Sequence, residues 1–208
     1  MSEEKIIALT FDDGPSIPTT GQMLDVLQKY DVPASFFVCG CHIDTTTAEL
    51  MRRAVSMGCD IQNHSLTHVD MTSMTAEEIS NEIKITSDKI REAVGTDPGF
   101  FRPPYIAVNQ TMREAVGLPF IQGIGAEDYI PTVSAQERCD RIIAQAGDGI
   151  VILLHDMKDN SKTVEAVDMI IPKLKAEGYR FVTVTDLFKE KGVVPKNGVM
   201  YTSVFEEK

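Results

Sequence analysis

The sequence predicts an α/β fold in which one parallel sheet is built from strands that alternate with helices. Short apolar runs alternate about seven times with longer segments in which apolar residues recur at helical spacing. No Ser/Gly-rich linker or change of composition divides the 208 residues, so we expect a single domain over residues 1–208. Its core is expected to span about residues 5–188, followed by a tail at residues 189–208.

The first half of the chain contains three strand–helix units. The predicted strands cover residues 5–11, 34–38 and 59–63, and the predicted helices cover residues 20–30, 48–57 and 75–94. The third helix has the clearest boundaries, because Thr75 and Glu78 form a capping-box pattern at its start and Gly95 follows its end.

The second half repeats the alternation. The predicted strands cover residues 99–102, 118–123, 150–155 and 181–184, and the predicted helices cover residues 109–116, 134–146 and 162–176. The purely aliphatic run at 150–154 indicates a buried strand, and Ser134 with Glu137 repeats the capping-box pattern. In the tail, the Asn197-Gly198 turn between two short apolar runs predicts a hairpin.

The composition and charge exclude several classes of function. Apolar residues make up 43% of the chain and charged residues 25%, which is typical of a folded globular protein rather than a disordered or fibrous one. The net charge of −11 would repel nucleic acids and anionic membranes, so neither is an expected partner. No run approaches the roughly 20 apolar residues of a membrane span. The N-terminus lacks a signal-peptide pattern, so we expect a cytoplasmic protein or a secreted one whose signal was removed.

Polar residues follow the predicted strands, at the positions where functional groups of parallel α/β folds lie. We therefore expect them to converge on one rim of the sheet. These residues are Asp12, Asp13, His64, His68, Arg102, Tyr105, Glu127, Asp128, Tyr129, His155 and Asp156.

The two histidines at positions 64 and 68 suggest a metal site. A spacing of four residues places both imidazoles on one face if the segment makes a helical turn. With one carboxylate they would form a two-histidine, one-carboxylate site that keeps open positions. Surface or capping histidines are the alternative, but His155 and the pair Asp12-Asp13 on the same rim favour the metal site. One aspartate could bind the metal while the other accepts a proton; an Asx turn accounts for only one of them.

Arg102 and His155 each have two interpretations. Arg102 precedes two prolines, which make its backbone extended and rigid, so it suits either a fixed carboxylate partner or a surface salt bridge. His155 ends the most apolar strand and is either a core histidine or a general acid. A carboxylate partner such as Asp128 would favour the acid, because it would hold the tautomer and raise the pKa of His155.

Four motifs occur in an order and spacing that resemble one known family. The motifs are Thr10-Phe11-Asp12-Asp13-Gly14, His64-Ser65-x-x-His68, Arg102-x-Pro104-Tyr105 and Leu153-x-His155. With them, the chain resembles the polysaccharide deacetylases, carbohydrate esterase family four, over nearly its whole length. The resemblance implies a distorted (β/α) barrel with seven or eight strands. It also implies a metal-dependent hydrolase that removes acetyl groups from N-acetylated or O-acetylated carbohydrates by attack of a metal-bound water.

The resemblance further implies a metal site. Asp13, His64 and His68 would bind one divalent metal, most commonly zinc, with cobalt, manganese or nickel in some members. The expected partner is an acetylated oligo- or polysaccharide, and the chain is expected to be a monomer or a weak homo-oligomer.

The remaining roles also come from the resemblance. Asp12 would be the catalytic base, oriented by Arg102, and His155 would be the general acid, supported by Asp128. The backbone N–H of Tyr105 would help to stabilise the oxyanion.

The substrate-contacting residues include one departure from the family pattern. The resemblance places Tyr105, Leu153 and Tyr129 at the substrate, with Leu153 lining the acetyl pocket. The fourth family motif usually reads Asp-x-x-Asp-Trp, whereas Gly125 and Tyr129 stand at its first and last positions here. This change favours short oligosaccharides or small acetylated molecules over crystalline polymers.

Two alternatives stay open at this point. One is a non-catalytic sugar-binding relic of the same family, and the second is an acetyl-xylan-type O-acetyl esterase. A phosphatase interpretation of the Asp12-Asp13 loop is disfavoured, since such loops usually separate their two aspartates by one residue and use magnesium with a lysine.

Overall fold

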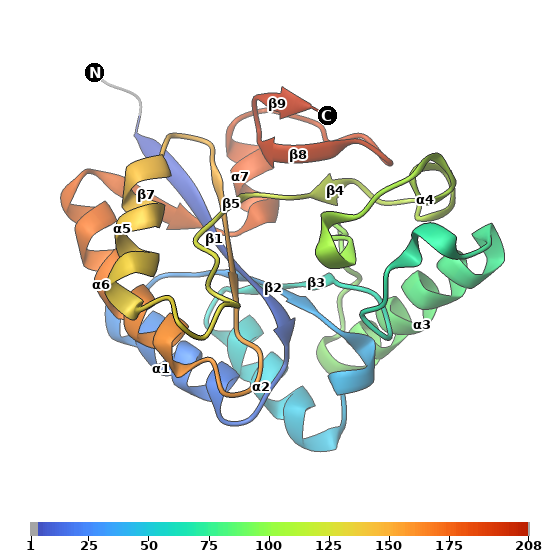
Figure 1. The fold of residues 1–208 in the computed structure, drawn as a ribbon, viewed down its shortest axis with the longest axis horizontal. Helices are drawn as coiled ribbons and strands as arrows, with labels where there is room; N and C mark the ends of the chain where they lie inside the picture. The colour runs from blue at the N-terminus through green and yellow to red at the C-terminus, as the bar shows by residue number, and fades with distance from the viewer. Residues whose placement is uncertain (1–3, 208) are drawn as a thin grey trace.

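The fold is organised around one long central strand, β1 (Lys5–Gly14), in a computed structural model that describes residues 4–207 (Figure 1). The first sheet has the order β3-β2-β1-β6-β5, and β7 pairs with the first half of β1. All pairings in this sheet are parallel. The other strands are β2 (Ser35–Val38), β3 (Asp60–Asn63), β5 (Ile124–Gly125), β6 (Val151–His155) and β7 (Tyr179–Val182). Because β1 is covered on both faces, its sequence is almost continuously apolar before the two aspartates.

A smaller set of strands closes the sheet into an irregular barrel. β4 (Phe120–Ile121) pairs in parallel with β8 (Met200–Ser203), which pairs antiparallel with β9 (Glu206–Glu207). Isolated bridges then link the two sheets: Asn63 with Phe101, Phe101 with Phe120, and Ile150 with Ser203. The ring of strands is therefore closed through single bridges in three places, which confirms the predicted distorted barrel.

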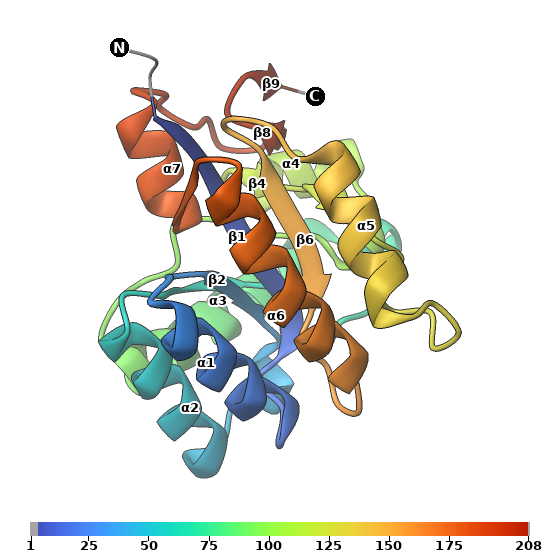
Figure 2. The same ribbon diagram turned by 90° about the vertical axis from the view of Figure 1, so that its left-hand side faces the viewer.

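Helices cover the outside of this barrel, and in Figure 2 α6 lies in front of β1, with α1 on its left and α5 on its right. The helices are α1 (Thr19–Tyr30), α2 (Thr45–Ser56), α3 (Ala76–Val94), α4 (Gln110–Ala115), α5 (Ala135–Gln145), α6 (Ser161–Ala176) and α7 (Val184–Glu190). None of these helices is long and apolar enough to cross a membrane.

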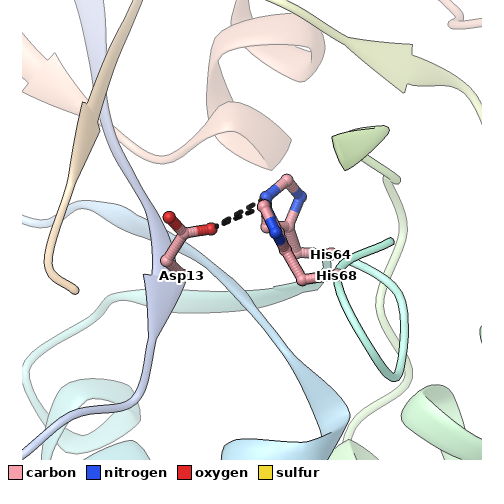
Figure 3. Close-up of side chains that lie close together, drawn as sticks. All are labelled: Asp13, His64 and His68. Atoms are coloured by element: carbon pink, nitrogen blue, oxygen red, sulfur yellow. Dashed lines mark ion pairs between the residues drawn. The ribbon is translucent and has the colours of Figure 1, made fainter. Parts of the chain in front are cut away.

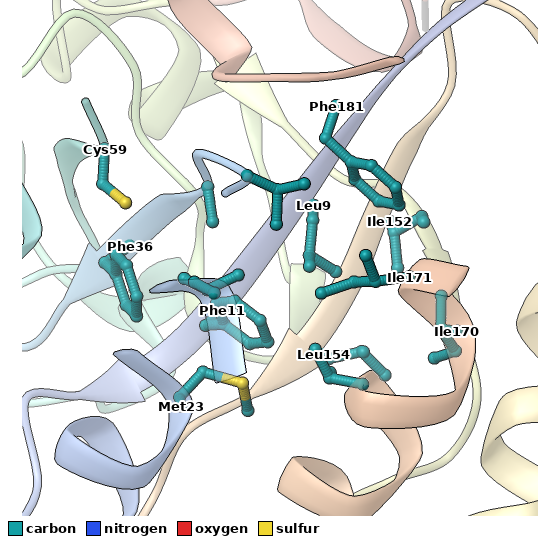
Figure 4. Close-up of a cluster of buried hydrophobic side chains, with 14 of the residues drawn as sticks. Leu9, Phe11, Met23, Phe36, Cys59, Ile152, Leu154, Ile170, Ile171 and Phe181 are labelled. Atoms are coloured by element: carbon teal, nitrogen blue, oxygen red, sulfur yellow. The ribbon is translucent and has the colours of Figure 1, made fainter. Parts of the chain in front are cut away.

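The largest hydrophobic core packs the sheet against these helices (Figure 4). Leu9 and Phe11 of β1 and Leu154 of β6 belong to one cluster with Met23 of α1 and Ile171 of α6, and none of the five has exposed surface. Burying a side chain of this size contributes about 1.5–3 kcal/mol. The cluster therefore keeps β1 and β6 rigid. These strands carry Asp12 and Asp13 near the end of β1 and His155 at the end of β6.

The predicted helix caps are confirmed at both capping boxes. The Thr75 hydroxyl accepts from the backbone N–H of Glu78, whose carboxylate accepts from the Thr75 N–H in return. Ser134 and Glu137 make the same pair of contacts at α5. These local patterns depend only on neighbouring residues, which is why the sequence predicts them well.

The structure corrects four predictions about individual elements. The strand predicted at 181–184 ends at Val182, and Thr183 instead caps α7 by accepting from the N–H of Asp186. Residues 99–102 make only bridges at Phe101, and β5 was not predicted. The chain does turn at 197–198, but the hairpin lies farther on, between β8 and β9. The reason is that β8 finds its first partner in β4, far away in the sequence.

Candidate active site

A cleft of about 640 Å³ opens at the C-terminal ends of the strands. Eight of the ten residues predicted for the site line it, and the other two, Arg102 and Asp128, are buried behind it. The lining residues from the prediction are Asp12, Asp13, His64, His68, Tyr105, Tyr129, Leu153 and His155. The predicted convergence on one rim is therefore what the fold produces.

Asp13, His64 and His68 come together at the centre of this cleft (Figure 3). The Asp13 Oδ1 atom lies 3.2 Å from His64 Nε2 and 3.0 Å from His68 Nε2. Asp13 has a left-handed backbone with φ of 71°, and the β1–β2 register shifts between Asp12 and Gly14. This irregularity breaks the strand alternation, so the adjacent side chains of Asp12 and Asp13 both reach the cleft.

The two histidines are not on a helical turn, contrary to the condition used in the prediction. They lie on an irregular loop after β3, in which Ser65 and His68 have positive φ values of 66° and 55°. The Asn63 side chain accepts from the N–H of Ser65, and the Ser65 hydroxyl accepts from the N–H of His68. These hydrogen bonds fold the loop back on itself and bring the two imidazoles to 4.9 Å between ring centroids.

The donor atoms of this triad fit a divalent cation. His64 Nδ1 lies 2.7 Å from the backbone carbonyl oxygen of Arg102, which can only accept, so Nδ1 carries the hydrogen. In the neutral ring, His64 Nε2 then presents a lone pair to Asp13 Oδ1, a buried oxygen to which only a protonated imidazole could donate. The ligand atoms of the triad all lie within 4.8 Å of one another. Lone pairs arranged in this way repel one another unless a cation lies between them.

When no cation is bound, a proton on His68 can reduce the repulsion between these lone pairs. The hydrogen bond with Asp13 raises the pKa of His68 against the lowering effect of burial. Burial raises the pKa of Asp13, but the two histidines outweigh it and hold that pKa well below its usual range. A metal ion at this site would compete with this proton for His68 Nε2, because a ligating imidazole nitrogen must be unprotonated.

Asp12 is held in one orientation by a buried guanidinium. Arg102 has no exposed surface, so the surface salt bridge considered above is wrong. Its Nη1 donates to Asp12 Oδ1 at 2.6 Å, and its Nη2 donates to the carbonyl oxygen of Gln122 at 2.6 Å. Its guanidinium carbon also lies 4.1 Å from the ring centroid of Phe37. The other carboxylate oxygen of Asp12, Oδ2, lies 3.7 Å from His64 Nε2, on the side of the metal-donor atoms.

His155 is held by a second buried carboxylate on the opposite side. Asp128 Oδ1 lies 2.8 Å from His155 Nδ1, and Asp128 Oδ2 accepts from the backbone N–H of His155 at 2.8 Å. Burial lowers the pKa of His155, but the hydrogen bond and charge of Asp128 outweigh it and raise that pKa to about 9. The side chain keeps 15% of its surface exposed and lines the cleft, so it is not a core histidine.

Two exposed tyrosines flank the metal-donor atoms. Tyr105 is 70% exposed and its ring lies 4.9 Å from that of His68, whereas Tyr129 is 56% exposed and lies 5.8 Å from the ring of His155. Leu153 lines the cleft between them along β6. An open cleft with aromatic rings at its edges suits a sugar, which presents both apolar ring faces and hydroxyl groups.

The sequence analysis missed the residues that support Asp128 from behind. Thr163 donates from its hydroxyl to Asp128 Oδ2 at 2.8 Å, and Asn160 donates from its side chain to the His155 carbonyl oxygen at 3.0 Å. Arg138 contacts both Thr163 and Asn160. One signal was available, because Arg138 lies on the same helix face as Ile142, where an apolar residue is expected.

Comparisons with known proteins identify the family of the chain. Residues 1–118 match the family model of the polysaccharide deacetylases. The bifunctional xylanase/deacetylase of Pseudobutyrivibrio xylanivorans is 50% identical over 192 residues, which cover 92% of this chain and 32% of that protein. A peptidoglycan-N-acetylglucosamine deacetylase of Bacillus cereus is 36% identical, with 91% of both chains covered. The chain spans 40% of the peptidoglycan-N-acetylglucosamine deacetylase PgdA of Listeria monocytogenes, so several curated relatives are much longer.

Solved structures give the same result. The Xyl-CE4 domain of a multidomain xylanase from the hindgut metagenome of Trinervitermes trinervoides is 48% identical, with a TM-score of 0.96 over 98% of this chain and 99% of that one. A family 4 acetyl xylan esterase from Clostridium thermocellum, in complex with a cobalt ion, is 43% identical, with a TM-score of 0.94 over 96% and 99%. This chain belongs to the polysaccharide deacetylase family.

Proposed function

We propose that this chain is a metal-dependent hydrolase that removes acetyl groups from carbohydrates. One observation carries the proposal: three metal-donor atoms share one cleft with a carboxylate fixed by Arg102 and an imidazole fixed by Asp128. Hydrolysis of an amide or ester needs a site that polarises the carbonyl, a base for the attacking water and an acid for the leaving group. A protein that only binds sugar has no need of this separate base and acid.

The first half of the reaction uses Asp13, His64, His68 and Asp12. A divalent cation held by Asp13, His64 and His68 would polarise the acetyl carbonyl and lower the pKa of water. Asp12 Oδ1 is occupied by Arg102, so Oδ2 is the oxygen left to accept the proton from the attacking water. The backbone N–H of Tyr105 is our candidate donor to the oxyanion that forms at the acetyl carbon.

The second half of the reaction uses His155. Asp128 holds the proton on Nδ1, which leaves Nε2 as the atom that delivers a proton to the leaving nitrogen or oxygen. A pKa of about 9 keeps this imidazole protonated at neutral pH. The products are acetate and a free amine or hydroxyl on the sugar.

Zinc is our first candidate for the cation. Two imidazole nitrogens and one carboxylate oxygen form the ligand set of catalytic zinc sites, which keep a further position for water or substrate. The similar acetyl xylan esterase from Clostridium thermocellum contains cobalt, which accepts similar ligands. Asp13, His64 and His68 would hold either metal.

The second candidate function is hydrolysis of O-acetyl esters on xylan. It is favoured by the relatives, because those named for xylan reach 50% and 48% identity whereas the peptidoglycan deacetylases that we compared reach at most 38%. An ester needs the same groups as an amide but less assistance from the acid, since an alkoxide leaves more readily than an amide anion. Loss of His155 would therefore impair amide hydrolysis more than ester hydrolysis.

The decisive experiment combines metal analysis with acetate release. Purified chain, stripped of metal and reloaded with Zn²⁺ or Co²⁺, should bind about one ion and release acetate from N-acetylglucosamine oligomers or acetylated xylan. Asp13→Ala should lose both the metal and the activity. Asp12→Asn should keep the metal and lose about 10²- to 10⁴-fold in activity, because it removes only the base.

Three outcomes would count against the proposal. One is metal-loaded protein that releases no acetate from either substrate. Another is Asp13→Ala protein that retains its full metal content. Sugar binding measured by calorimetry without turnover would instead support the non-catalytic alternative.

A further inference from the structure

Arg138 is a buried cation behind the acid side of the cleft. It lies in the first turns of α5 with 1% of its surface exposed. Its guanidinium donates to four uncharged acceptors: the carbonyl oxygens of Ile130 and Val133, Asn160 Oδ1 and Thr163 Oγ1. Among the side chains that the structure describes, no carboxylate lies at ion-pairing distance from it. A buried guanidinium without a direct counter-ion is costly, so its compensation has to come from a charge farther away.

The strongest such charge is that of Asp128, one hydrogen-bonded residue away, and Glu165 contributes a weaker one. Thr163 Oγ1 accepts from Arg138 Nη1 at 2.7 Å and donates to Asp128 Oδ2 at 2.8 Å. A hydroxyl has a single hydrogen, so the guanidinium, which can only donate, leaves that hydrogen for the carboxylate. Burial lowers the pKa of Arg138, and the charge of Asp128 opposes this effect.

Asn160 makes a second link between the same groups. Its Oδ1 accepts from Arg138 Nη1 at 2.6 Å, which directs its Nδ2 toward the His155 carbonyl oxygen at 3.0 Å and Asp128 Oδ2 at 3.4 Å. With the N–H of His155 and the hydroxyl of Thr163, these donors occupy Asp128 Oδ2. Asp128 Oδ1 is then left for the His155 ring alone.

We propose that Arg138 is a positioning residue for the deacetylation reaction, which orients Asp128 and thereby the His155 ring through the side chains of Thr163 and Asn160. The inference rests on the proposed function, because it assumes that His155 is the acid. Asp128, Asp12 and Asp13 are the carboxylates that act on the charge of His155, and His68 is the nearby imidazole. Of these groups, only Asp128 is hydrogen-bonded to the network that contains Arg138.

The test compares variants that break this network with variants that keep it. Thr163→Val keeps the shape of the side chain and removes the hydroxyl, whereas Thr163→Ser keeps the hydroxyl. Arg138→Met removes the cation, and Arg180→Met removes an exposed arginine that pairs with Glu4 and Glu190 instead. Thr163→Val and Arg138→Met should each lower kcat about 10- to 100-fold, the range typical of residues that orient a functional side chain. KM and metal content should stay unchanged, and Thr163→Ser and Arg180→Met should behave like the wild type.

A second measurement reports the orientation of the ring without any turnover. The hydrogen-bonded Nδ1 proton of His155 should give a downfield, slowly exchanging NMR signal in the wild type, Thr163→Ser and Arg180→Met. It should be lost or broadened in Thr163→Val and Arg138→Met. When Thr163→Val and Arg138→Met are combined, kcat should fall no further than in the more impaired single variant, because both changes break the same link from Arg138 through Thr163 to Asp128.

The outcomes separate this inference from the proposed function. Folded Arg138→Met protein with wild-type kcat and an intact Nδ1 signal would overturn the role of Arg138. If Arg138→Met does not fold, the same result in folded Thr163→Val protein would overturn it, because Thr163 is the main link: its hydrogen bonds to Arg138 and Asp128 are 2.7 and 2.8 Å long, whereas Asn160 reaches Asp128 only at 3.4 Å. If the wild type releases no acetate yet the Nδ1 signal responds as expected, the proposed function fails while the orienting network stands.

Discussion

At the scale of single residues, the site depends on backbone conformations that side chains rarely adopt. Asp13, Ser65, His68 and Tyr105 all have positive φ values, between 55° and 71°. Such conformations cost of order 1–3 kcal/mol each, so the surrounding structure must supply that energy. At Asp13 the gain is clear, because the local irregularity lets two consecutive carboxylates serve different partners: Arg102 for Asp12 and the two histidines for Asp13.

The first prediction concerns the pair Asp128 and His155. Asp128→Asn removes the charge that raises the pKa of His155, so this pKa should fall from about 9 toward or below its ordinary value of 6.5, since burial lowers it. NMR titration of the metal-free protein measures this change directly. Asp97→Asn, which changes an exposed acid paired with Arg91, should leave the His155 titration unchanged. A His155 pKa that stays near 9 in Asp128→Asn would show that another group sets it.

The same pair makes stability depend on pH. The folded-state pKa of His155 lies above the unfolded value, so its stabilising contribution is complete below pH 6.5 and is lost as the pH rises through about 9. Asp128→Asn should remove this loss. Urea unfolding of metal-free protein at several pH values in this window measures it.

At the scale of elements, the end of β1 is packed too tightly for any side chain at Gly14. A Cβ atom there would lie 2.5 Å from both carboxylate oxygens of Asp156. Asp156 cannot move away easily, because it is fully buried, Thr20 donates to its side chain, and its own N–H donates to the carbonyl oxygen of Asp12. The turn that follows Asp12 and Asp13 is therefore tightly packed between the ends of β1 and β6.

Gly14→Ala should consequently destabilise the protein by about 1–3 kcal/mol, the usual cost of overpacking a tight interior. It should also lower metal affinity, since Asp13 is the preceding residue. Gly99→Ala is the matched control, because a Cβ at Gly99 has no atom within 4 Å. Equal urea-unfolding midpoints for the two variants would show that Asp156 yields to the added methyl group.

At the scale of the whole molecule, the barrel is completed by the last strand pair of the described chain. β8 joins β4 in parallel and supplies Tyr201, which has no exposed surface and whose ring lies 5.1 Å from that of Phe188. A bridge from Ser203 to Ile150 then connects β8 to the start of β6, the strand that carries His155. β8 lies more than 40 residues after His155 in the sequence. It nevertheless contacts the start of the strand that carries this histidine.

Tyr201→Ala should therefore cost about 3–5 kcal/mol, as expected for removal of a large buried aromatic ring. Tyr201→Phe keeps the ring and loses only the hydroxyl that accepts from the N–H of Lys196, so it should cost about 0.5–1.5 kcal/mol. Guanidinium unfolding of both variants gives the comparison. Equal stabilities would mean that β8 does not take part in the cooperative core.

Features that depend on near neighbours and on motif spacing follow from the sequence alone. The sequence predicted the alternation of strands and helices, both capping boxes and the residues that line the cleft, because strand ends, turn chemistry and the four motifs are all local. How the barrel closes and which groups hold the acid depend on long-range contacts, which are visible in the three-dimensional fold. The bridges around Phe101 and Ser203 and the path from Arg138 to Asp128 join residues far apart in the sequence or on different elements. Their energies depend on three-dimensional distance and burial, which no local pattern of residues specifies.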